Sequence, residues 1–426
     1  MKVETIADHP LTSVTLDDSD TTTGQLKQKL RKAERLNRVK AFMLVVPLLL
    51  FVGVTFVMPI AEMLHRSIYD PLVVESFPNT VAKLEDWQRQ QLPGDDAFQA
   101  IAQELVTLQQ QRQLSKVATR LNTECSGMRS LLTKTGRKLA RQSELVDARQ
   151  AMIGIDKRWA DLGTWSAIKN LSSSYTLSYY LAALDMRYDT QGEIEAQPEQ
   201  RQIYKTLLVK TFAISLLITV LCLVLGYPLA YMLATLPESR SNLLMILVLL
   251  PFWTSLLVRT TAWIALLQTN GVVNSTLLAL GAIAEPLTLL YTEFATVLAM
   301  THILLPFMVL PLYSVMKGID PSYMRAAMSM GARPIRAWWS VYLPASLPGL
   351  SAGAMLVFII SVGYYITPAL VGGTDGQMIS NLIAFHMQQS NNWGLAAALG
   401  SLLLALILVI YFAFDRFVGA SNIKLG

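Results

Sequence analysis

The stretch MRAAMSMGARPIRAWWSVYLPASLPGL, residues 324–350, differs sharply from the sequence on either side of it. It carries three arginines, two adjacent tryptophans, pairs of small residues and several prolines, whereas long apolar runs flank it. On a helix, Ala327 and Gly331 share one face, because they are four residues apart. Pro334 suits the first turn of a second helix, where no backbone N–H is needed. The stretch predicts two short helices, which form either an ordinary basic loop or an element that seats in a groove of another protein.

The rest of the chain has the composition of a membrane protein. Of its 426 residues, 53% are hydrophobic and only 15% are charged, whereas about 25% charged residues are usual in soluble proteins. A helix of about 20 apolar residues crosses a bilayer. Six segments reach that length, at residues 41–60, 206–235, 243–267, 291–316, 347–370 and 394–416. A shorter patch at 272–283 suits a helix at the membrane interface. The predicted fold class is therefore an all-α polytopic membrane protein.

The distribution of Lys and Arg predicts the orientation of these spans, since positive residues favour the cytoplasmic side. Residues 1–40 hold eight of them and residues 317–346 hold four, whereas loops 268–290 and 371–393 hold none. We therefore expect 1–40 to be a cytoplasmic N-terminal tail and 317–346 a cytoplasmic loop. Residues 417–426 are then a cytoplasmic C-terminal tail.

Residues 61–205 form a large insertion between the first and second spans, on the external side of the membrane. Its pattern predicts helices, because two sets of residues each share one helical face: Ile101, Leu105 and Leu108, and Leu132, Thr135 and Leu139. Aromatic residues gather near its end: Trp159, Trp165, Tyr175, Tyr179 and Tyr180. These rings either form the core of a small helical domain or rest at the lipid interface, or they provide a docking surface for an external protein or a ligand site. The remaining spans make a five-span core over residues 206–416.

No catalytic or metal-binding pattern occurs in the sequence. It lacks a phosphate-binding Gly-rich loop, a His-Glu-x-x-His zinc motif and a nucleophile elbow. We therefore expect no enzyme active site, no metal site, no bound cofactor and no nucleic-acid partner. Any energy for active work has to come from a partner protein.

The opening stretch resembles the cytoplasmic "EAA" loop of membrane subunits of ATP-binding-cassette importers. That pattern is Glu-Ala-Ala, three residues, Gly, nine residues, then Ile-x-Leu-Pro. Val341 stands for the isoleucine, and Arg325 replaces the glutamate, which reverses the charge. The resemblance implies that the residues coupling this chain to an ATPase are Arg325, Ala326, Ala327, Gly331, Ala332, Leu343 and Pro344.

Longer stretches are similar to the permeases of spermidine/putrescine-type importers: residues 249–274, 305–320, 364–373 and 378–399. The insertion departs from them, because their first external loop is short. The resemblance implies a six-span type I importer permease in the bacterial inner membrane. Its implied partners are two ATP-binding subunits that carry ATP and Mg²⁺, a second permease and a periplasmic solute-binding protein.

A cationic solute needs carboxylates and aromatic faces along its route. The candidates for this translocation path are Trp253, Arg259, Glu293, Tyr364, Tyr365 and Asp375. Arg259 is expected to anchor a carboxylate or carbonyl groups, and each aromatic residue has packing as its alternative role. The predicted function is therefore import of a small, polyamine-like cation. One alternative is another small organic solute, such as an amino-acid derivative, and a second is a membrane-anchored periplasmic sensor.

Overall fold

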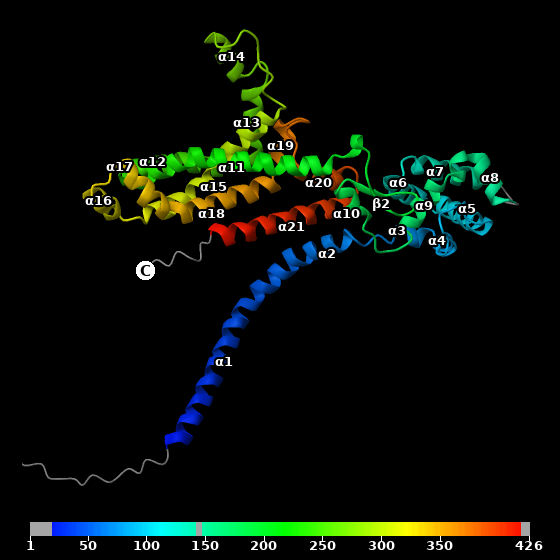
Figure 1. Cartoon of the computed structure of the whole chain (residues 1–426), viewed down its shortest axis with the longest axis horizontal. Helices are drawn as coiled ribbons and strands as arrows, with labels where there is room; N and C mark the ends of the chain where they lie inside the picture. Colours follow the sequence, from blue (N-terminus) through cyan, green and yellow to red (C-terminus); the bar gives the residue numbers. More distant parts are fainter. Residues whose placement is uncertain (1–18, 142–146, 419–426) are drawn as a thin grey trace, which may run out of the picture. The chain divides into compact units, whose positions relative to one another are not determined.

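The computed structural model of this chain describes residues 19–141 and 147–418 (Figure 1). The predicted tails at the two ends of the chain therefore lie partly outside the described residues. Lys2 of the N-terminal tail and Lys424 of the C-terminal tail are among the residues outside. The chain forms two compact units, Met1–Met63 and Leu64–Gly426.

The first unit is a nearly continuous helical segment. Helix α1 covers Ser19–Val52, a π-helical turn η1 covers Gly53–Val57, and α2 begins at Met58 and ends at Arg66. Residues Asn37–Arg66 are long and apolar enough to cross a membrane, and they include the predicted span 41–60. Most apolar side chains along that segment are exposed, as expected of a helix that faces lipid.

The second unit begins with the insertion, which is mainly helical as predicted. Its elements are α3 (Leu72–Ser76), α4 (Pro78–Leu84), α5 (Asp95–Gln110), α6 (Leu114–Glu124), α7 (Met128–Leu139), α8 (Ala148–Ile155), η2 (Lys157–Ala160), α9 (Leu162–Asn170), α10 (Ser178–Ala183), β1 (Met186–Tyr188), β2 (Ile194–Ala196) and η3 (Glu199–Arg201). The predicted apolar faces of α5 and α7 are both buried.

Two tryptophans form the centre of the insertion's core. Trp159 and Trp165 are fully buried, and their ring centroids are 5.6 Å apart. Each indole N–H donates a hydrogen bond, from Trp159 to the Thr135 hydroxyl at 2.9 Å and from Trp165 to the Trp159 carbonyl at 3.0 Å. The interpretation of these two rings as core residues is therefore confirmed. Tyr175, by contrast, is exposed.

The short hairpin β1–β2 is an element that the sequence pattern did not predict. Its strands pair antiparallel, with Arg187 opposite Glu195. The Asp189 side chain accepts hydrogen bonds from two backbone N–H groups of the turn, and Gly192 has a positive φ of 91°. Strands of three residues contain too little alternation to be recognised in a sequence.

The predicted five-span core follows the insertion. Its elements are α11 (Tyr204–Thr235), α12 (Glu238–Trp253), α13 (Leu256–Leu267), α14 (Val272–Ala279), α15 (Glu293–Lys317), α16 (Pro321–Ser329), α17 (Pro334–Ala337), the π-helical turn η4 (Trp338–Tyr342), α18 (Leu343–Gly363), α19 (Ile366–Val371), α20 (Ile379–Gln388) and α21 (Trp393–Val418). Among the described residues of the whole chain, five helical segments can cross a membrane, or six if one bent pair counts as a single span.

That bent pair corrects the prediction of one straight span at 243–267. Helix α12 and the segment Leu256–Ala279 meet at an angle of 98°. The chain leaves the helix at Thr254, and the Ser255 hydroxyl caps α13 by accepting the N–H of Val258 at 3.2 Å. A hydroxyl cap satisfies a backbone donor at a helix start, so it stabilises a new helix directly after the two polar residues Thr254 and Ser255.

Helices α11, α15 and α18 pack together as the centre of the core. Gly349 and Gly353 of α18 lie directly against α15. A Cβ atom on Gly349 falls 2.9 Å from the Pro311 carbonyl oxygen, and one on Gly353 falls 3.0 Å from that of Met308. Only glycine permits so close an approach of two helix backbones.

The insertion is attached to the core through α10 and α21, which pack against each other. The Tyr180 hydroxyl lies 2.8 Å from the Ser401 hydroxyl of α21 and 2.9 Å from the Ser67 hydroxyl, at the start of the insertion. A second hydrogen bond joins Tyr204 of α11 to His386 of α20 at 3.1 Å. These contacts hold both ends of the insertion against the core.

Candidate functional site

The stretch that interrupts the apolar runs begins with a well-capped helix. The Asp320 carboxylate accepts the backbone N–H of Ser322 at 2.7 Å, and Pro321 occupies the first turn of α16. These are the residue types that start helices. Hydrogen bonds from Ser322 hold the pKa of Asp320 below its usual value, so this cap is ionised at neutral pH.

The glycine of the motif ends this helix. Helix α16 stops at Ser329, and Gly331 has a φ of +90°. The N–H of Gly331 bonds to the Met328 carbonyl at 2.9 Å, and the N–H of Ala332 bonds to the Ala327 carbonyl at 3.1 Å. This pair of bonds is a Schellman motif, in which glycine takes the left-handed position. The prediction that Ala327 and Gly331 share one helical face is therefore wrong, because the helix ends between them.

The two alanines of the motif face opposite ways. Ala327 is 7% exposed and Met324 packs against the core, whereas Arg325 and Ala326 are exposed. The segment also presents large apolar side chains outward, namely Tyr323, Met328, Met330, Ile335 and Trp339. Exposed apolar groups that are this close in sequence suit contact with another protein.

Leu343 and Pro344 lie at the joint between this segment and the span. Proline has no N–H, so Pro344 cannot bond to the Ser340 carbonyl, and the helix widens into the π-helical turn η4 just before it. The joint is held on the core by the Tyr227 hydroxyl, 2.9 Å from that of Ser346. These two motif residues therefore shape the connection to α18.

At another point of the core, the structure brings two predicted path residues together. Glu293 lies in the first turn of α15, and its carboxylate is 3.3 Å from the ammonium of Lys210 on α11. The same ammonium donates a hydrogen bond to the backbone carbonyl of Asp375, whose side chain is exposed. Lys210 was missed by sequence reasoning, because it lies inside an apolar span and the search for compensating cations covered only the loops.

The loop that carries Asp375 is fixed on both sides. The Thr296 hydroxyl donates to the Gly376 carbonyl at 3.2 Å, and the Thr211 hydroxyl accepts the N–H of Ile379 at 2.7 Å. Thr211 directly follows Lys210, so the ammonium and its two oxygen acceptors are held by a rigid frame.

The other path candidates are not joined to this cluster by any hydrogen bond or ion pair among the described residues. Trp253 ends α12 beside the bend and is 71% exposed. Tyr364 and Tyr365 lie at the break between α18 and α19, where their carbonyls accept from Ser380 and Asn381. The Nε atom of Arg259 is buried and has no hydrogen-bond partner. At that atom, Arg259 therefore does not make the predicted contact with a carboxylate or a carbonyl group.

Comparisons with known proteins place the chain in a family of membrane transport components. The binding-protein-dependent transport system inner membrane component family matches residues 226–421. The spermidine/putrescine transport system permease protein PotB of Haemophilus influenzae is 33% identical over 217 residues, which are 50% of this chain and 76% of that protein. Its namesake in Escherichia coli (strain K12) is 34% identical, over 50% of this chain and 79% of that protein.

A relative named for a different solute also matches. The molybdenum transport system permease protein ModB of Mycobacterium bovis is 30% identical over 256 residues, which are 59% of this chain and 92% of that protein. The chain belongs to the family of binding-protein-dependent inner membrane transport components. It is a multi-pass inner-membrane permease subunit of an ATP-binding-cassette importer, and permeases of this kind are non-catalytic.

Proposed function

We propose that this permease subunit moves a polyamine, or a closely related small amine, from the periplasm to the cytoplasm. The observation that carries the proposal is the cluster at Lys210, where a carboxylate and a carbonyl already hold an ammonium group. The likeness to two permeases named for spermidine and putrescine supports the same solute class.

The lysine side chain is chemically close to the proposed solute. It ends in a primary ammonium on a four-carbon stem, which is the group at each end of putrescine. Glu293 and the Asp375 carbonyl therefore bind a tethered copy of the solute's own head group. An incoming polyamine competes with Lys210 for these two acceptors, and it gains a charge-assisted contact when it displaces the lysine.

The energy comes from partner subunits in this proposal. Two ATP-binding subunits bind ATP and Mg²⁺, and the exposed face of α16 and the residues after it seat in a groove of one of them. The joint at Leu343 and Pro344 passes that motion to α18. A second permease completes the pore, and a periplasmic solute-binding protein delivers the solute. In this arrangement both termini are cytoplasmic, and the insertion lies in the periplasm.

A transport assay on the reconstituted complex tests the solute. Proteoliposomes containing both permeases and the ATPases, with the binding protein outside, are expected to take up labelled putrescine when ATP is inside. Excess unlabelled spermidine should block that uptake, whereas molybdate and amino acids should not. Uptake of molybdate or an amino acid without any uptake of putrescine contradicts the proposed solute.

Variants at the cluster test its role. Glu293→Gln removes the charged acceptor and should raise the KM for putrescine by about tenfold, the factor that corresponds to ~1.4 kcal/mol. Asp375→Asn keeps the backbone carbonyl that Lys210 contacts, so it serves as the matched control and should change the KM little. Equal effects of the two substitutions contradict the proposed binding geometry.

A further inference from the structure

The insertion concentrates its positive charge on one helical hairpin. Residues 64–203 contain seventeen Lys or Arg and seventeen Asp or Glu. Residues 112–141 contain eight of these basic residues and a single acidic one, Glu124. Glu124 is itself paired with the buried Arg120 at 2.8 Å. The excess positive charge thus belongs to the hairpin of α6 and α7, since the insertion as a whole is balanced.

A groove of about 940 Å³ lies along this hairpin. No Asp or Glu lines it among the described residues, and six cationic side chains do: Arg112, Arg129, Lys134, Arg137, Lys138 and Arg141. All six belong to exposed residues. The five from Arg129 to Arg141 extend over about 18 Å at the rise of a helix, so the groove suits an extended anionic surface better than a single small anion.

Most of these charges do not serve the stability of the insertion. Lys134 pairs with Asp156 at 3.0 Å, but the other five cations form no ion pair within the part of the chain that the structure describes. Lys134 and Lys138 are four residues apart, as are Arg137 and Arg141. Like charges at this spacing destabilise a helix. A set of cations that lowers the stability of its own helix and lies on one exposed face indicates a role in binding.

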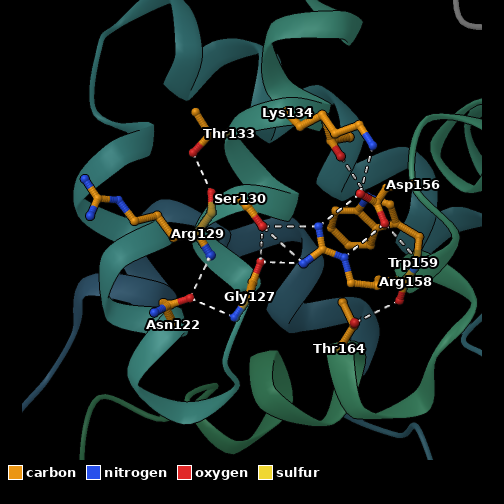
Figure 2. A network of polar contacts seen from close by, with 11 residues as sticks. Asn122, Gly127, Arg129, Ser130, Thr133, Lys134, Asp156, Arg158, Trp159 and Thr164 are labelled. Carbon is orange, nitrogen blue, oxygen red and sulfur yellow. Dashed lines mark hydrogen bonds and ion pairs between the residues drawn. The ribbon is translucent and has the colours of Figure 1, made fainter.

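The groove is preformed, because a network of polar contacts fixes the turn that opens α7 (Figure 2). Arg158 donates to the Gly127 carbonyl at 2.8 Å, and the Asn122 side chain accepts the N–H groups of Gly127 and Arg129 at 2.9 and 3.3 Å. Hydrogen bonds from Arg158 hold the pKa of Asp156 well below its usual range. Asp156 therefore stays ionised and keeps Arg158 in place.

The groove continues toward the permease core. A second hollow, of about 1460 Å³, shares Arg112, Asn122 and Arg129 with it. The far side of this hollow is lined by residues 389–392, which join α20 to α21. The basic surface therefore leads from the insertion to the end of the core where the insertion is attached.

We propose that this basic groove receives the acidic face of the solute-binding protein, an inference that rests on the proposed polyamine function. A protein that captures a polycation needs carboxylates in its cleft, so the surface around that cleft is acidic. No large apolar side chain is exposed among the described residues of 65–174. The contact is consequently electrostatic. It speeds the association of the solute-binding protein with the permease, and it orients the cleft of that protein toward the core.

Association rates measured on the whole transporter test this docking. The permease complex is held in nanodiscs, and the binding protein that stimulates its ATPase is added at about 50 mM and about 500 mM salt. Arg137→Glu should lower the association rate constant about tenfold at low salt and much less at high salt. Arg137→Lys keeps the charge and should leave the rate nearly unchanged.

A matched control separates the groove from charge in general. Lys157→Glu makes the same type of charge reversal at an exposed residue of the insertion that does not line the groove. An equal fall in rate for Lys157→Glu, or an unchanged rate for Arg137→Glu, overturns the proposal. So does an effect of Arg137→Glu that appears only with anionic lipid in the nanodisc, because the groove would then bind the membrane.

The same variants distinguish failure of this inference from failure of the proposed solute. If wild-type proteoliposomes import putrescine and Arg137→Glu leaves the association rate unchanged, the docking is wrong and the solute assignment stands. If putrescine is not imported, the proposed function is wrong and the argument for an acidic binding protein falls with it.

Discussion

Helices α16 and α7 are both short and both expose at least one arginine, yet they present different surfaces. A glycine in the left-handed region adjoins each of them, Gly331 after α16 and Gly127 before α7, with φ angles of +90° and +94°. The segment around α16 exposes large apolar side chains, whereas α7 exposes cations and no large apolar group. Positive charge alone therefore does not define a binding mode. Exposed apolar area suits a stable interface with slow dissociation. A polar, charged face suits a contact whose association is fast and depends on salt.

The largest expected effect is at Gly331. Gly331→Leu places a side chain at φ +90°, which costs about 1–2 kcal/mol in local strain and disrupts the turn that ends α16. We expect putrescine uptake to fall below a tenth of the wild-type rate while the subunit remains inserted. Gly281→Leu is the matched control, because Gly281 also has a positive φ and open space around it.

Gly331→Asn then separates conformation from size. Asparagine tolerates the left-handed region, so uptake should recover if the turn alone is required. If Gly331→Leu transports normally, α16 is not the coupling element, and the comparison with α7 loses its basis.

A smaller loss is expected from the exposed apolar residue that directly follows α16. Met330 is 83% exposed, and Met330→Asp should reduce co-purification of the ATPase about tenfold, since a buried unpaired charge is costly at an interface. The reduction should be similar at low and high salt, in contrast to the salt-sensitive effect at Arg137. A loss that disappears in high salt indicates that both helices act electrostatically.

Arg325→Glu restores the glutamate of the family pattern, and its effect should be smaller again. Arg325 is exposed and interacts electrostatically with Asp320, the cap of α16. Exposed ion pairs contribute only ~0–1 kcal/mol, so ATP-coupled uptake should change no more than about fivefold. A complete loss of uptake indicates that Arg325 meets a buried acidic residue of the ATPase, and a basic substitution at that residue should then restore coupling.

A separate effect, on thermal stability and not on transport, is expected at the turn that opens α7. Asp156→Asn weakens the contacts with Arg158 and Lys134 and should destabilise the insertion by about 1–2 kcal/mol at neutral pH. The folded-state pKa of Asp156 is depressed, so its contribution is present above the unfolded value of about 3.9 and is lost as the pH falls. The difference in Tm between the two forms should therefore begin to shrink as the pH falls below about 4, and it should vanish only below the depressed folded-state pKa of Asp156. A constant difference in Tm contradicts this origin.

Patterns that extend over many residues allowed much of the fold to be predicted. The apolar runs located the spans, although the one predicted at 347–370 already ends at Gly363, and the spacing of motif residues indicated two short helices, which lie at Pro321–Ser329 and Pro334–Ala337. The buried faces of α5 and α7 followed from helical periodicity. These predictions succeeded because each depends on a sum over several side chains.

Features that depend on one or two atoms could not be predicted. The 98° bend depends on the Ser255 cap, and a serine between two apolar runs looks the same whether or not the helix breaks there. The cluster at Glu293 depends on Lys210, which precedes it by more than eighty residues in the chain. The sequence placed Gly331 correctly in the motif. Glycine is needed there because of its positive φ angle, which the spacing of residues does not reveal.

The hydrogen bonds around Tyr180 have a consequence for biosynthesis. Tyr180 contacts Ser67, which is made early, and Ser401, which belongs to the last membrane helix. A ribosome has to synthesise more than two hundred further residues after Tyr180 before Ser401 exists. A nascent chain truncated before α21 therefore leaves this tyrosine without one of its two partners. The insertion can fold early, but it becomes fastened to the core only after α21 has been synthesised.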